Sequence, residues 1–114
     1  RNVEGIVACS DGAGTICEVG SEVTQWQVGD RVAGLFFQSW HSGRFLMEYH
    51  KGARGGSGCN GMLARYVAGD ASSFVRIPET YQTIQASTLP CAALTAWHAL
   101  MTRGGLKPQQ SVCV

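Results

Sequence analysis

Short stretches in which apolar and polar residues alternate dominate the first two thirds of the chain. A period of two is typical of half-buried β-strands. Gly20-Ser21 and Val28-Gly29-Asp30 are turn signals between the first two stretches, and the Asp30 carboxylate is suited to accept local backbone N–H groups. Pro78 ends the last stretch, because proline cannot donate to a strand ladder. The pattern predicts a mainly β domain with strands at 15–19, 31–37, 62–67 and 73–77.

After Pro78 the period lengthens to about 3.6 residues, which indicates helix. A short helix is expected around 81–86, and Pro90 suits the first turn of a second helix. Gly104-Gly105 is suited to end that helix. The second helix, CAALTAWHALM, carries an apolar side that we expect to face a core; its members are Ala93, Trp97, Leu100 and Met101.

A turn and an apolar strand over 111–114 follow this helix. Helix, turn and apolar strand in this order are how an α/β layer begins. We therefore expect two parts: a β domain over 1–88, and a linking helix with the first strand of a further domain over 89–114.

Residues 38–60 have neither period. Five glycines and scattered aromatic residues fill this stretch, and a loop of this length in a small domain is typically a functional insertion. Trp40 and Phe45 either line a substrate cleft or anchor the insertion. His41 and His50 have no acid or serine at a diagnostic spacing and are expected to be solvated.

Charge and composition exclude several classes of partner. The 114 residues include nine basic and eight acidic side chains, for a net charge of +1, so the sequence lacks the basic patch of a nucleic-acid binder. No apolar stretch reaches the roughly 20 residues that span a membrane. Charged residues make up 15% of the chain, below the typical figure of about 25%, which predicts that part of the surface is covered by something else.

The five cysteines are widely spaced and contain no Cys-x-x-Cys pair. This spacing favours buried, reduced thiols in a cytoplasmic protein over a disulfide framework.

Four segments resemble, in order, the medium-chain dehydrogenase/reductase superfamily, and most closely its zinc-independent, quinone-oxidoreductase-like branch. They are SDGAGTICEVGSEVTQWQVGDRVAG, GMLARYVAGDASSFVRIP, STLPCAALTAWHALM and GGLKPQQSVCV. The resemblance implies a GroES-like β-barrel catalytic domain, a short helical bridge and the first strand of a truncated Rossmann domain. In that family a glycine-rich dinucleotide loop follows the strand that matches 111–114. We therefore expect that the segment upstream of Arg1 and the rest of the nucleotide-binding domain are missing from this sequence.

The same resemblance bears on zinc. Cys9-Ser10-Asp11 matches a Gly-His-Glu triplet of zinc-containing relatives, so Ser10 stands where they have a histidine ligand. A neutral hydroxyl is a poor zinc ligand. Cys91 matches a further ligand position and is the one weak metal candidate, whereas only Cys59 lies where those relatives carry a four-cysteine lobe. We expect no zinc.

Thr95 matches the threonine that contacts the nicotinamide end of the cofactor in relatives. Its alternative role is a hydrogen bond back to a carbonyl one helical turn earlier. Gly12 and Gly14 resemble part of a dinucleotide fingerprint, but a strand follows them where a helix is required. We expect these glycines to permit a close approach or a bulge within the β domain.

The resemblance implies an oxidoreductase that uses NADP(H) in preference to NAD(H) and acts on a small-molecule carbonyl, quinone or activated alkene. It also implies a homodimer for the full-length protein, and no catalytic residue is assigned. The 114-residue chain alone is expected to be inactive. The alternative is a non-catalytic GroES-like β-barrel module that binds a partner through residues 38–60.

Overall fold

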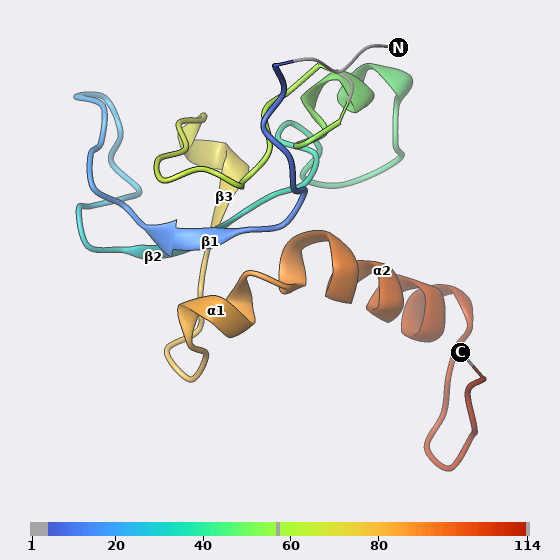
Figure 1. Cartoon of the computed structure of the whole chain (residues 1–114). Coiled ribbons are helices and arrows are strands. Elements are labelled where there is room, and N and C mark those ends of the chain that lie inside the picture. Colours follow the sequence, from blue (N-terminus) through green and yellow to red (C-terminus); the bar gives the residue numbers. More distant parts are fainter. Residues whose placement is uncertain (1–4, 57, 114) are drawn as a thin grey trace.

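The computed structural model describes residues 5–56 and 58–113 (Figure 1). Its strands are β1 (Ala13–Thr15), β2 (Arg31–Gly34) and β3 (Phe74–Arg76), in the order β1-β2-β3. Both pairings are antiparallel, with Gly14 opposite Val32 and Ala33 opposite Val75. The sheet therefore joins residues from both ends of the predicted β domain.

Short helices surround and follow this sheet. The two 3₁₀ segments are η1 (Met47–Gly52) and η2 (Ala71–Ser73), and α1 (Thr83–Ala86) is one α-helical turn. A longer helical segment then runs from residue 89 to residue 103: η3 (Leu89–Ala93), α2 (Leu94–Trp97) and η4 (His98–Arg103). Unlike η1 and η2, the η3 and η4 segments on either side of α2 are π-helical. Ala93 N donates to Thr88 O (3.2 Å) and Gly104 N donates to Ala99 O (2.8 Å), and each acceptor lies five residues earlier. No helix in the described part of the chain is long and apolar enough to cross a membrane.

The core lies between the sheet and the helices on one side of it (Figure 1). Ala33 of β2, Ile77 and Ala86 of α1 are buried together, with Ala13 and Leu89 packed against them. The first turn of η3 therefore belongs to the same core as the sheet.

A salt bridge between Asp30 and Arg76 stabilises this framework. Asp30 accepts the Gln27 backbone N–H at 3.1 Å, which confirms the predicted local turn, and also accepts both Nη atoms of Arg76 at 2.6 and 3.0 Å. The Arg76 hydrogen bonds and the Gln27 N–H hold the pKa of Asp30 below its usual value. The Arg76 guanidinium lies over the Trp26 ring, 5.2 Å from its centre, and so makes a cation–π contact in addition to the salt bridge.

Arg54 is buried to 2% exposure. Its Nε donates to Leu35 O (3.1 Å), its Nη2 donates to Ser73 Oγ (3.2 Å), and its guanidinium lies 5.2 Å from the centre of the Phe74 ring. Burial lowers the pKa of Arg54, and nearby Cys59 acts in the opposite direction. This side chain fastens the 38–60 insertion to β2 and β3.

The insertion itself is closed at its base. Phe37 and Ala53 form an isolated antiparallel bridge, Gln38 N donates to Gly52 O (3.3 Å) and Arg54 N donates to Phe36 O (2.9 Å). The η1 turn lies within the loop that this base encloses.

Several predicted elements differ from the structure. The first strand begins earlier than expected and ends at Thr15, and the second ends at Gly34 instead of residue 37. Residues 62–67 form no strand. A strand requires a hydrogen-bonded neighbour, whereas the backbone N–H groups of Met62 and Leu63 bond irregularly to Cys9 O and Ala8 O, beside a Cys9 with φ of 73°. Residues 111–113 are also irregular, and Val114 lies outside the described residues.

Several side chains that we expected to be buried are exposed. Trp97 is 62% exposed and Met101 is 41% exposed, so the apolar side of the helix does not face a core formed by the described residues. Cys9, Cys17 and Cys113 are exposed, contrary to the expectation of buried thiols, while Cys59 and Cys91 are half-buried. A Cβ at Gly12 would lie 2.9 Å from Met62 Cγ, which confirms a close approach there, but a Cβ at Gly14 would meet nothing within 4 Å.

Candidate functional site at the start of the helical segment

The loop before β1 meets the start of the helical segment through one carboxylate. Asp11 Oδ2 accepts the Ser10 hydroxyl at 2.9 Å, and Asp11 Oδ1 accepts the backbone N–H of Cys91 at 2.5 Å. Asp11 and Cys91 are 80 residues apart in the sequence. All three residues are half-buried. The structure thus brings Ser10 and Cys91 together around Asp11, a residue to which the sequence analysis assigned no role.

Local sequence explains why Cys91 needs this distant partner. The first N–H groups of a helix have no intrahelical acceptor, and a side chain at the N-cap usually provides one. Here the N-cap is Thr88, whose hydroxyl instead donates backwards to Gln85 O (2.8 Å). Pro90 has no N–H to satisfy. Asp11 therefore supplies the acceptor that the local sequence does not.

Thr95 follows Cys91 by one helical turn, so both side chains lie on the same face of the segment. Its side chain is exposed. The hydroxyls of Ser87 and Thr88 donate to carbonyl groups three residues earlier, at 2.8 Å each, whereas Thr95 makes no such bond to any described residue. The back-bonding alternative therefore finds no support, and the hydroxyl of Thr95 is free to donate and accept toward a ligand.

The residues at this junction do not fit a zinc ion. The Ser10 hydroxyl is engaged as a donor to Asp11, and Cys91 contributes the only thiol of the cluster. Across residues 5–56 and 58–113, no three His, Cys, Asp or Glu side chains gather in a way that could hold a metal. Gln38 Nε2 donates to the sulfur of Cys59 at 2.8 Å.

Trp40 and Phe45 lie in an aromatic cluster inside the insertion. The two rings meet edge to face with their centres 5.2 Å apart, and Phe37 packs against both, with centre distances of 5.8 and 4.8 Å. Tyr49 and His50 complete the cluster around Phe45. This packing gives both residues an anchoring role within the loop, and their part in a substrate cleft stays a prediction.

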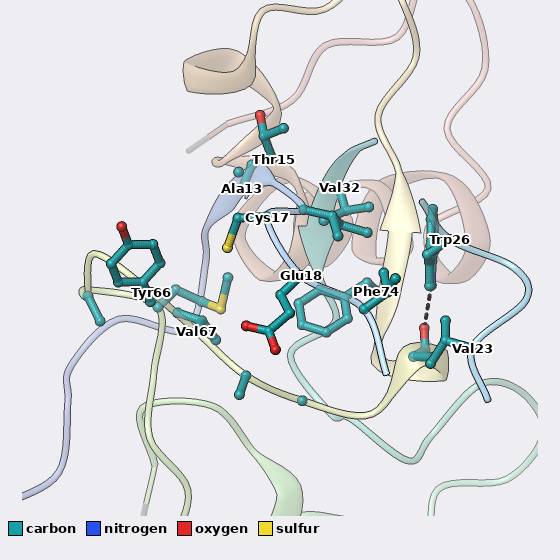
Figure 2. A pocket seen from close by; sticks show the side chains of 18 of the residues that line it. Ala13, Thr15, Cys17, Glu18, Val23, Trp26, Val32, Tyr66, Val67 and Phe74 are labelled. Carbon is teal, nitrogen blue, oxygen red and sulfur yellow. Dashed lines mark hydrogen bonds between the residues drawn. The ribbon is translucent and has the colours of Figure 1, made fainter. Parts of the chain in front are cut away.

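A half-open groove of about 870 Å³ lies on another part of the β domain (Figure 2). Figure 2 shows Tyr66 and Val67 facing Phe74 across it, with the Glu18 carboxylate between them. Its walls come largely from 13–20 and 62–69, which include two of the predicted strands. Thr95, Trp40, Phe45 and Cys91 are not among its lining residues. The groove therefore lies apart from the junction at Asp11.

Comparison with known proteins decides the family. Residues 2–79 match the alcohol dehydrogenase GroES-like domain, which is more than half of the chain. The chain belongs to the GroES-like alcohol dehydrogenase family. The GroES-like alcohol dehydrogenases are oxidoreductases of the medium-chain dehydrogenase/reductase superfamily, so the fold class and the superfamily predicted from the sequence are confirmed.

The proteins that this chain matches are much longer than the chain, which spans about a third of an alcohol dehydrogenase-like relative. A zinc-type alcohol dehydrogenase-like protein of Schizosaccharomyces pombe is 34% identical over 111 residues, which are 96% of this chain and 32% of that protein. Polyketide synthase GfsB of Streptomyces halstedii is 35% identical over 105 residues, or 92% of this chain and 2% of the synthase. A crystal structure of a protein described as an alcohol dehydrogenase from Sinorhizobium meliloti 1021 superposes with a TM-score of 0.81 at 35% identity, over 94% of this chain and 32% of that protein.

Proposed function

We propose that this chain forms the catalytic-domain part and helical bridge of a zinc-independent, NAD(P)H-dependent oxidoreductase. The reaction is hydride transfer between a nicotinamide and a small-molecule carbonyl, quinone or activated alkene. The cofactor supplies the redox chemistry when it is bound, and the protein orients it and stabilises charge that develops on the substrate oxygen. Membership of the GroES-like alcohol dehydrogenase family supports the reaction class.

The observation that carries the proposal is the free, exposed hydroxyl of Thr95, one turn beyond the anchored Cys91. A hydroxyl here can hydrogen-bond the amide end of a nicotinamide. NADP(H) rather than NAD(H) is the proposed cofactor, by resemblance to the quinone-oxidoreductase-like branch. The proposal also places the enzyme in the cytoplasm as a homodimer, where its exposed thiols would stay reduced.

Most of the cofactor's affinity should come from outside these 114 residues. Dinucleotides bind to a glycine loop between a strand and a helix N-terminus, and the described residues contain no strand, glycine loop and helix in that order. The isolated chain should therefore bind NADPH weakly or not at all and turn over no substrate.

The test uses a longer protein that contains this chain. That protein should oxidise NADPH with a quinone or an enone. Replacing Thr95 by the isosteric valine removes one hydrogen bond, worth about 0.5–1.5 kcal/mol, and should lower kcat/KM by about tenfold at most. Thr102→Val, on the exposed last part of the same segment, is the matched control and should change nothing.

Two results would contradict the assignment of Thr95. One is a Thr95→Val variant with unchanged kinetics, and the other is micromolar binding of NADPH by the 114-residue chain alone. A longer protein without any NADPH-dependent activity would favour the alternative, a GroES-like module that binds a partner.

A further inference from the structure

The first turn of the helical segment 89–103 attaches it to the β domain. Leu89 packs against the core of Ala33, Ile77 and Ala86, and Cys91 N–H donates to Asp11. Every residue from 92 to 99 is exposed. Beyond its first turn, the segment extends away from the sheet (Figure 1).

The two attachments constrain the segment differently. The apolar contact of Leu89 has no preferred direction, so it fixes the distance between helix and sheet but tolerates tilting. A hydrogen bond is directional and weakens steeply when its angle departs from linearity. The Asp11 carboxylate is itself held by the Ser10 hydroxyl on its second oxygen. Its negative charge also lies at the positive end of the segment's peptide dipoles.

We propose that Asp11 is a positioning residue that sets the direction in which the helical segment leaves the β domain, and thereby places Thr95. The inference about Thr95 rests on the proposed function, whereas the inference about the segment does not. In this proposal Asp11 acts through its hydrogen bond to the Cys91 backbone and not through contact with a substrate or cofactor.

The lever arm gives the size of the effect. Four residues of helix separate Cys91 from Thr95, which is about 6 Å along the axis. A tilt of about 10° at the anchor would therefore displace Thr95 by about 1 Å. A misplacement of about 1 Å can lower the rate of a positioned reaction by about 100-fold. Because Asp11 acts through Thr95, the contribution of the Thr95 hydroxyl, about tenfold at most, limits the loss of activity here.

The first experiment measures backbone amide exchange at Cys91 in a longer protein that contains this chain. Asp11→Ala removes the acceptor and should speed exchange of this amide by about tenfold or more, because a hydrogen bond to a charged group is lost. Asp11→Asn keeps an oxygen at the same place and should retain most of the protection. Glu79→Ala, which removes an exposed carboxylate elsewhere in the domain, should leave the exchange unchanged.

The second experiment measures kinetics in the same variants. Asp11→Ala should lower kcat by up to about tenfold with a smaller change in the KM for NADPH, and Asp11→Asn should restore most of kcat. In the Asp11→Ala background, Thr95→Val should have almost no further effect, because the hydroxyl is already misplaced. A merely structural role of Asp11 would instead leave the effect of Thr95→Val undiminished.

The outcomes separate the two proposals. Unchanged exchange at Cys91 in Asp11→Ala overturns the positioning role, whatever the activity. Additive effects of Asp11→Ala and Thr95→Val overturn it as well. Faster exchange at Cys91 in a protein without NADPH-dependent activity supports the anchor and refutes the proposed function. Should Asp11→Ala fail to fold, exchange at Cys91 in Asp11→Asn and Ser10→Ala provides the test. Most of the protection retained in Asp11→Asn, with a larger loss in Ser10→Ala, supports the proposal. Equal loss in both variants overturns it.

Discussion

Replacing Arg54 with methionine should destabilise the protein by about 1–3 kcal/mol. The guanidinium makes two hydrogen bonds, to Leu35 O and Ser73 Oγ, from a position that is 2% exposed. Bonds from a charged donor contribute about 1.5–3 kcal/mol each. The substitution also relieves the cost of burying a charge, which offsets part of that loss. Ser73 Oγ keeps its own bond to Asp70 O (2.7 Å), so the unsatisfied group is chiefly the Leu35 carbonyl.

Arg54→Lys makes the prediction sharper. Lysine keeps the charge but lacks the planar fork, so it cannot serve Leu35 and Ser73 together in this geometry. It should therefore be nearly as destabilising as Arg54→Met. Urea-induced unfolding, followed by tryptophan fluorescence, gives both values. Thermal unfolding should show a midpoint lower by about 4–12 °C for a chain of this size.

Arg44→Met is the matched control, because Arg44 is exposed in the same insertion. It should change the free energy of unfolding by less than about 0.5 kcal/mol. The reasoning is refuted if Arg54→Lys is as stable as the wild type, since the charge alone would then suffice. It is also refuted if Arg54→Met costs no more than the control.

Further predictions concern acid stability, metal content and thiols. Because the folded-state pKa of Asp30 lies below its value of about 3.9 in an unfolded chain, the stabilisation by Asp30 is present above that value and is lost as the pH falls through the folded pKa. Melting temperatures of the wild type and Asp30→Asn should differ at pH 7, and the difference should shrink as the pH falls below about 3.9. Elemental analysis should find no stoichiometric zinc; zinc that is lost on Cys91→Ser would overturn the reading of the junction. Alkylation without reductant, read by mass spectrometry, should modify all five cysteines, the exposed ones before Cys59 and Cys91; a native disulfide would contradict the proposed compartment.

Local features of the fold were predictable from the sequence. β3 lies inside the predicted 73–77, and α1 lies inside 81–86. The glycine cap after the second helix is confirmed, with Gly105 at φ of 59° and Leu106 N donating to Leu100 O at 2.9 Å. These features depend on neighbouring residues, so a sequence window contains the information that determines them.

Features that depend on residues far apart in the sequence could not be predicted from it. Residues 62–67 have the alternation of a strand, but the ladder partner that would make them one is not present among the described residues. Asp11 reaches Cys91 across 80 residues, and no periodicity signals such a pair. Arginine side chains are mostly exposed in folded proteins, so the residue type alone does not predict that Arg54 is buried.

The candidate site was predicted only in part. Thr95 was found through a family resemblance, and the structure adds that its hydroxyl is exposed and free of back-bonding. The one available signal for Asp11 was its place beside Ser10 in the matched triplet. An acidic residue ahead of a β-strand has many uses, and only the fold shows which backbone N–H it serves.

Because the insertion is closed at its base, residues 39–51 can be replaced or changed in length with little effect on the sheet. The Phe37–Ala53 bridge, the bond from Gln38 N to Gly52 O and the grip of Arg54 all lie below residues 39–51. Changes of length or sequence above that clasp need not propagate into the sheet, because loop closure becomes only slowly more costly with length. Natural variation or laboratory grafting could therefore diversify this part of the surface while β2 and β3 stay as they are.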